Sequence, residues 1–158
     1  MHATHDFSSF SLRHAVESDI AFLLDLRIQA MGPHHRAAGV VLSAQEHEQR
    51  MRDHFECAEV IEVEGAPVGM LKVLRAGLDW RIMQIQLLPP HQRRGIGGQL
   101  VRTVVAEAGS AGASLRLTVM KANPQARRLY ERLGFTVVSE SAGGFQMLAR
   151  DDTLSNAP

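Results

Sequence analysis

The segment that decides the fold is a short loop rich in arginine and glycine, Gln92-Arg93-Arg94-Gly95-Ile96-Gly97-Gly98. It follows a strand-like run, Trp80 to Leu88, and it opens a series of apolar residues at helical spacing, Ile96 to Ala108. Glycines allow a sharp turn and bring backbone N–H groups close to a ligand. The first turn of a helix adds unpaired N–H donors and the positive end of the helix dipole. With Arg93 and Arg94 beside them, these groups predict a cradle for a pyrophosphate.

Two common phosphate-binding motifs do not fit this loop. The dinucleotide fingerprint G-x-G-x-x-G would need glycine where Leu100 stands. It would also need an acidic residue about 20 residues further on, where the chain has Leu115 and Arg116. The P-loop needs Gly-Lys followed by Ser or Thr, and no such tripeptide is present. The loop therefore predicts neither kind of nucleotide site.

The loop does match another pattern, Gln/Arg-x-x-Gly-x-Gly/Ala, over Gln92 to Gly97. It resembles motif A of the Gcn5-related N-acetyltransferases (the GNAT superfamily), whose loop binds the pyrophosphate of acetyl-CoA. A second segment, Asn123 to Phe135, resembles the family's motif B, N-x-x-A-x-x-L-Y-x-x-x-G-F. A helix and a strand are expected between the two motifs, as the family requires. The order of strands, helices and turns agrees over nearly the whole chain.

The resemblance implies where the cofactor binds. In the family, backbone groups at the end of the strand before motif A pair with pantetheine and polarise the thioester carbonyl. Here the N–H of Leu87 or of Leu88 is the expected oxyanion donor. The loop amides would hold the pyrophosphate, and Asn123 would serve both the pantetheine arm and the helix cap. The cofactor-binding residues implied in this way are Gln86, Leu87, Leu88, Gln92, Arg93, Arg94, Gly95, Ile96, Gly97, Gly98 and Asn123.

The resemblance also assigns Tyr130, the one tyrosine of the chain, as the catalytic general acid. A phenol has an ordinary pKa of about 10, so it keeps a proton for the departing thiolate at neutral pH. The general base departs from the family pattern. Thr118, Gln84 and Gln86 stand where relatives carry a carboxylate, and none of them accepts a full proton. Ordered water, an amine that arrives neutral, or a residue of the 33–56 region remain as alternatives; the histidines of that region are His34, His35, His47 and His54.

The remaining sequence predicts an α/β (α+β) fold. The resemblance sharpens this to a mixed, mostly antiparallel sheet of six to seven strands flanked by about four helices. The expected strands are Leu12–Val16, Val60–Val63, Val68–Leu74, Trp80–Leu88, Leu115–Val119, Phe135–Val138 and Phe145–Leu148. The expected early helices are one from Ile20 that Gly32-Pro33 ends, and one from a capping box at Ser43 towards Cys57, with His34 and His35 in the loop between them.

Composition bounds the class of protein. The 158 residues carry 17 Lys+Arg and 17 Asp+Glu, which gives a formal net charge of zero and argues against nucleic-acid or anionic-membrane binding. One cysteine excludes an internal disulfide. The first residues do not form a signal peptide, and no apolar run reaches the ~20 residues of a membrane helix. We expect a single cytoplasmic domain over residues 1–158, with an ordered core of about 10–150 and short polar tails.

Together these features predict an acetyl-CoA-dependent N-acetyltransferase. The expected reaction is direct attack of a primary amine, from a small molecule or a peptide, without a metal. His47-Glu48 does not extend to the His-Glu-x-x-His of zinc enzymes, because Met51 occupies the last place. A homodimer is compatible with this class. The alternative is a non-catalytic acyl-CoA-binding or sensing module of the same fold.

Overall fold

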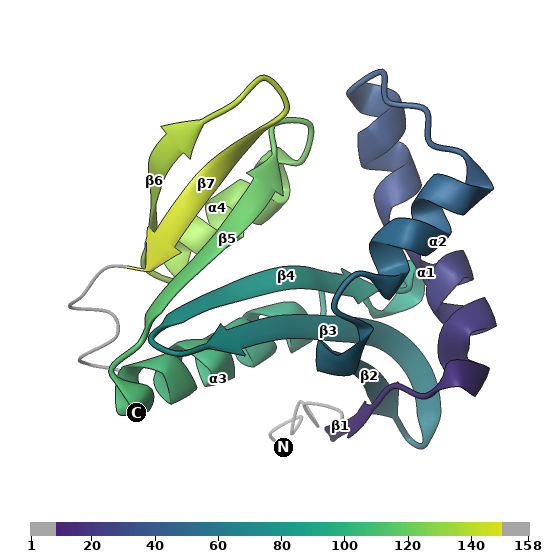
Figure 1. Ribbon diagram of the computed structural model, residues 1–158, viewed down its shortest axis with the longest axis horizontal. Coiled ribbons are helices and arrows are strands. Elements are labelled where there is room, and N and C mark those ends of the chain that lie inside the picture. Colours follow the sequence, from purple (N-terminus) through teal and green to yellow (C-terminus); the bar gives the residue numbers. More distant parts are fainter. Residues whose placement is uncertain (1–8, 150–158) are drawn as a thin grey trace, which may run out of the picture.

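The computed structural model describes residues 9–149, so most of the two predicted tails lies outside the described residues. A seven-stranded sheet has the order β1-β2-β3-β4-β5-β7-β6 (Figure 1). Its strands are β1 Phe10–His14, β2 Ala58–Val63, β3 Ala66–Ala76, β4 Asp79–Leu87, β5 Ser114–Met120, β6 Phe135–Glu140 and β7 Gly144–Ala149. The described helices are α1 Ile20–Ala37, α2 Ala44–Arg52, α3 Ile96–Ala111 and α4 Pro124–Arg132. The predicted mixed α/β fold class is confirmed.

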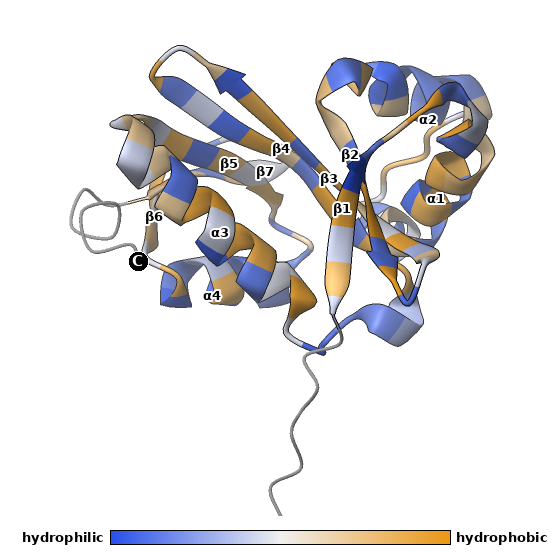
Figure 2. Cartoon of the chain, turned by 90° about the horizontal axis from the view of Figure 1, so that it is seen from below, coloured by the Kyte–Doolittle hydropathy of each residue, from blue (hydrophilic) through white to orange (hydrophobic). Residues whose placement is uncertain are grey.

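The helices cover both faces of the sheet. Alternate residues of β2 belong to different cores: Ile61 packs with the apolar side of α3, whereas Val60 packs with Leu23 of α1 and Met51 of α2. A period of two along a strand sends neighbouring side chains to opposite faces. Figure 2 shows the resulting layers, with α3 and α4 on one side of the strands and α1 and α2 on the other.

The sheet divides between β4 and β5. These are the parallel neighbours of the sheet, and their pairing runs from Asp79–Ser114 only as far as Ile82–Leu117. Beyond that point the two strands separate and leave the V-shaped opening of Figure 1. The second half of β4 therefore presents backbone groups on the β5 side that pair with no strand in the described part of the chain. Both sequence motifs lie next to this opening, because the loop follows β4 and α4 follows β5.

Two predicted helix ends were wrong. Gly32-Pro33 does not end α1, which continues to Ala37 and carries His34 and His35 on its last turn. A proline within a helix removes one hydrogen bond, and the buried imidazole of His35 ties the extra turn to the interior. The second helix ends at Arg52 rather than near Cys57.

The early end of α2 has a visible cause. Lys72 of β3 is fully buried, and its Nζ donates hydrogen bonds to the main-chain oxygens of Met51 and Asp53. These carbonyls are thereby satisfied outside the helix, and the chain turns at His54, whose φ is 52°. A short 3₁₀ segment, Phe55–Cys57, then leads into β2. The first strand is also shifted, to Phe10–His14 from the predicted Leu12–Val16.

No helix in the described part of the chain is both long enough and apolar enough to cross a membrane.

Candidate functional site

The arginine and glycine loop joins the end of β4 to the start of α3. After a 3₁₀ turn at Pro89–His91, Arg93 and Gly95 both adopt left-handed backbone conformations, with φ values of 61° and 83°. Gly95 is the residue before α3, and glycine adopts this conformation without the strain that a side chain brings. The start of α3 is therefore open, with bare backbone at Gly95 and Gly97.

A cavity of about 660 Å³ lies over this loop; we call it the loop cavity. Its lining includes four arginines and, among the described residues, no aspartate or glutamate; these arginines are Arg93, Arg102, Arg128 and Arg132. Arg93 also ties the loop to α4, because its Nη2 donates to Oε1 of Gln125 at 3.3 Å. A cavity lined by cations and glycine amides at a helix N-terminus suits a polyanionic ligand.

Most of the residues predicted to bind the cofactor line the loop cavity. They are Gln86, Leu87, Gln92, Arg93, Gly95, Gly97, Gly98 and Asn123. The other three do not line it: Ile96 is buried in the core below α3, Leu88 packs against the α1 and α2 core, and Arg94 is exposed to solvent. Asn123 also caps α4, since its Oδ1 accepts a hydrogen bond from the N–H of Ala126 at 3.2 Å.

The end of β4 distinguishes between the two amides proposed from sequence as oxyanion donors. The N–H of Leu88 donates to the carbonyl of Val68 at 2.8 Å and is therefore engaged on the β3 side. Successive N–H groups along a strand point to opposite edges, so the N–H of Leu87 faces the opening beside β5. The side-chain amide of Gln92 donates to the carbonyl of Leu87 at 2.9 Å and holds this strand end in place. Leu87 remains as the candidate donor.

A second cavity of about 420 Å³ fills the opening between β4 and β5, and we call it the strand cavity. It meets the loop cavity at six shared residues: Met31, Ile85, Gln86, Asn123, Ala126 and Tyr130. Tyr130 is 8% exposed, and its ring packs edge-on against Phe135 with 6.0 Å between centroids. Burial raises the pKa of Tyr130 to about 12, so the hydroxyl keeps its proton throughout the neutral range.

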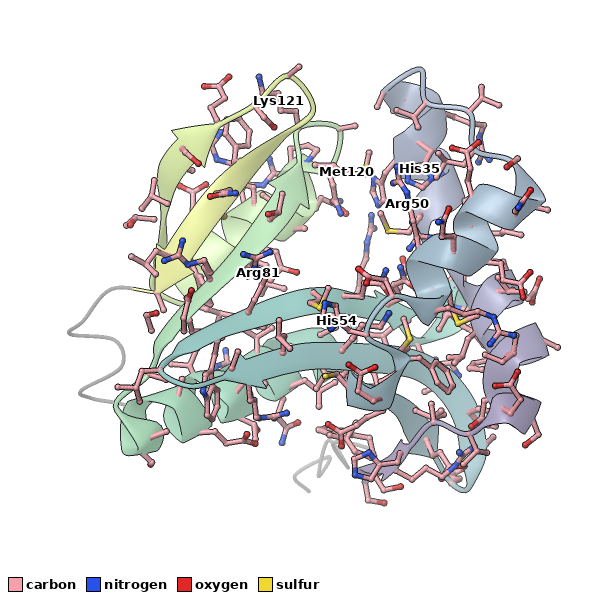
Figure 3. The ribbon with its side chains drawn as sticks, in the orientation of Figure 1. His35, Arg50, His54, Arg81, Met120 and Lys121 are labelled. Carbon is pink, nitrogen blue, oxygen red and sulfur yellow. The ribbon has the colours of Figure 1, made fainter. Side chains whose placement is uncertain are left out.

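The wall of the strand cavity opposite β5 carries three basic side chains, His35, Arg27 and Arg50. Figure 3 shows His35 and Arg50 on this wall, across the opening from Met120 of β5. Among the described lining residues there is again no aspartate or glutamate. The two arginines were missed in the sequence analysis. A signal for one of them exists, because Arg27 lies four residues from Leu23 and from Met31 on the apolar side of α1.

The histidines of the 33–56 region have different surroundings. His35 lines the strand cavity, whereas His34 lines the loop cavity. His47 accepts a hydrogen bond at Nδ1 from Nε of Arg27 at 3.2 Å, and His54 lines neither cavity. Burial, followed by the charge of Arg27, lowers the pKa of His35 below 6.5. His35 is therefore a neutral imidazole at neutral pH.

Comparison with known proteins identifies the family. The sequence model of the Acetyltransferase (GNAT) family matches residues 21–135, which include the loop, β4, β5 and α4. The chain belongs to this family. The resemblance seen in the two sequence motifs is thereby confirmed. No curated protein matches the GNAT chain in sequence.

Solved GNAT structures share the fold over nearly their whole length. PaiA N-acetyltransferase from Thermoplasma acidophilum, in complex with coenzyme A, is 15% identical, with a TM-score of 0.72 over 90% of this chain and 99% of that one. A chimera of the spermidine N-acetyltransferase SpeG from Vibrio cholerae and hSSAT is 19% identical, with a TM-score of 0.69 over 94% and 99%. The ribosomal-protein-S18-alanine N-acetyltransferase from Escherichia coli is 18% identical, with a TM-score of 0.67 over 89% and 93%. At these identities the likeness concerns the fold alone.

Proposed function

We propose that this protein transfers an acetyl group from acetyl-CoA to a primary amine. The observation that carries the proposal is that two cavities meet at Tyr130: one basic and suited to a polyanion, the other opening onto the divided strands. A GNAT neighbour was solved with coenzyme A, and two others are named as N-acetyltransferases of spermidine and of a protein alanine. A group-transfer enzyme needs such an arrangement, because both substrates must reach one point.

The loop cavity would hold the coenzyme. The amides that begin α3 and the guanidinium of Arg93 would bind the pyrophosphate, and the other three arginines would add positive charge around the same cavity. The pantetheine arm would run between β4 and α4 and end at the junction of the cavities. Its thioester would then lie beside Leu87, Asn123 and Tyr130, all of which line the loop cavity. The residues fit the group that the family implies.

The reaction would proceed by direct attack of the amine on the thioester carbonyl. A bond forms between the amine nitrogen and the carbonyl carbon, the carbon–sulfur bond breaks, and the amine loses one proton while the thiolate gains one. The N–H of Leu87 would stabilise the negative charge on the carbonyl oxygen. The hydroxyl of Tyr130 would donate to the departing sulfur, a role compatible with a pKa of about 12.

His35 is our candidate for the proton acceptor. Of the four histidines left open by the sequence, it alone lines the strand cavity among the described residues. Its lowered pKa keeps the imidazole neutral and able to accept a proton. In a His35→Gln variant, the acidic limb of the kcat/KM profile should disappear; an unchanged limb would assign proton uptake to water or to the amine itself.

Release of free thiol from acetyl-CoA, measured across a panel of primary amines, tests the proposal. Thiol release that depends on the amine, with acetylated amine as product, is the expected result. Tight CoA binding without amine-dependent thiol release would favour the alternative, an acyl-CoA-binding module. A failure to bind CoA would reject both functions.

A further inference from the structure

The strand cavity has a charge that is unusual for a site that receives an amine. An ammonium group is a cation, yet the titratable side chains in the described lining are three basic groups and Tyr130. A like charge nearby disfavours the charged form of a group and raises the cost of bringing a cation in. A diamine or polyamine would add two or more positive charges to this cavity. A cavity of this charge would therefore disfavour a polycation.

Arg27 is the clearest sign of a built anion site. Arg27 is only 4% exposed, and it lines the strand cavity. Nε is used in the hydrogen bond to His47, but within residues 9–149 neither terminal nitrogen has a hydrogen-bond partner or a carboxylate within ion-pair distance. Burial and the charge of Arg50 lower the pKa of Arg27 to about 10, which still leaves it cationic at neutral pH. A buried arginine without a carboxylate lacks the counter-ion that such a group normally has.

Arg50 approaches the same region from α2. It is exposed, lies in the strand cavity and has no ion pair among the described residues, although Arg52 of the same helix makes two. Its charge contributes to lowering the pKa of Arg27 and the pKa of His35, which line the same cavity. Two guanidinium groups that share one cavity without a carboxylate between them suit a planar or tetrahedral anion.

The β4 wall offers the complementary chemistry. Oε1 of Gln84 and Oε1 of Gln86 are both buried and have no hydrogen-bond partner within residues 9–149, and both residues line the strand cavity. Buried acceptors without partners are rare in folded proteins and are expected to be satisfied by a ligand or by water. An amine presents N–H donors to such acceptors. Gln86 also lies at the junction with the loop cavity, where the acetyl group would be delivered.

We propose that the acceptor is an amine that also carries an anionic group, a carboxylate or a phosphate, which Arg27 and Arg50 bind. The amine end lies towards Gln84 and Gln86, and an apolar stem lies against the side chains between the two ends; these include Met31, Ile82, Met83, Leu117 and Val119. This inference rests on the proposed function and names its substrate class. The same cations lower the pKa of the bound amine, which favours its nucleophilic neutral form.

Calorimetric binding to the CoA-saturated protein tests the inference independently of turnover. The probes are matched pairs: leucine with leucinamide, and phosphoethanolamine with ethanolamine, together with putrescine as a dication. In at least one pair, the acidic member should bind at least about ten times more tightly than its partner without the acidic group. The pair that shows this difference tells whether the site binds a carboxylate or a phosphate. Equal binding within both pairs, or tightest binding of putrescine, would overturn the inference.

Variants assign the preference to the arginines. Arg50 is exposed, and Arg50→Gln should reduce the preference for the acidic probe to about three-fold or less. Arg27→Gln should abolish this preference. Arg36→Gln is the matched control, because it removes one exposed positive charge from α1 at a position that lines neither cavity. An unchanged preference in Arg50→Gln and Arg27→Gln would refute the assignment.

If acidic probes bind selectively but no amine releases thiol, the proposed function fails and the anion site stands. If neutral amines are acetylated equally well, the anion site fails and the function stands.

Discussion

The Tyr130→Phe variant tests the assignment of the general acid. The ring of Tyr130 packs against Phe135, and phenylalanine preserves that contact. The hydroxyl has no hydrogen-bond partner among residues 9–149, so its removal leaves no protein group newly unsatisfied. We therefore expect the free energy of unfolding to change by less than about 1 kcal/mol, and the affinity for CoA to stay within about three-fold.

The effect on turnover should be much larger. General acid catalysis contributes about 10²- to 10⁴-fold. A thiol has an ordinary pKa of about 8.5, below the value of about 12 for Tyr130, so a thiolate departs fairly readily without help. This difference places the expected loss near the lower end, about 100-fold in kcat, or about 2.7 kcal/mol in the barrier.

Steady-state thiol release gives kcat, and calorimetry gives the CoA affinity. The wild-type rate should show no alkaline fall below about pH 10, because Tyr130 remains protonated there. Phe135→Leu is the control: it removes ring atoms beside Tyr130 and leaves the hydroxyl in place, costs about 1–3 kcal/mol of stability, and should leave kcat nearly unchanged. If Tyr130→Phe retains kcat within two-fold, Tyr130 is not the acid.

Three further changes test other parts of the account. Gly95→Val forces a β-branched residue into a φ of 83°, so CoA affinity should fall at least ten-fold by calorimetry; unchanged affinity would reject the loop as the cradle. In Gly69→Ala, the added Cβ would clash with the backbone oxygen of Gln86 at the end of β4. We expect kcat to fall more than CoA affinity, and the protein to lose about 1–3 kcal/mol of stability. Unchanged kinetics would show that the end of β4 takes no part in the mechanism. His35 and His47 both have pKa values below 6.5, chiefly through burial and then Arg27. Between those values and 6.5 the unfolded chain binds more protons, so the Tm should fall as the pH falls below about 6.5; a double Gln variant should flatten this dependence, and an unaltered slope would assign it elsewhere.

The sequence was informative where local chemistry decides structure. The loop at Gly95 needs a residue that tolerates positive φ, and Asn123 followed by proline marks a helix start; both features are legible in the chain itself. The sheet divides beyond Ile82, and no residue pattern within β4 marks that position.

The strand cavity could not be predicted because it depends on tertiary contacts. Pro33 is a strong stop signal, yet α1 continues past it and places His35 in the interior. Lys72 lies on β3, far along the chain from α2, and its hydrogen bonds to the end of that helix are not visible in any local sequence pattern. The spacing of Arg27 places it on the apolar side of α1, but the sequence does not show that α2 packs against it through His47. The proposed acceptor site therefore depends on how α1 and α2 pack over β4.

The most direct test of the central claim is amine-dependent thiol release from acetyl-CoA, compared between the wild type and Tyr130→Phe with the same acidic amine. We predict an acetylated amine from the wild type, with a rate that rises with amine concentration and falls about 100-fold in the variant. Thiol release that is independent of any amine, or a Tyr130→Phe rate within two-fold of the wild-type rate, would contradict it.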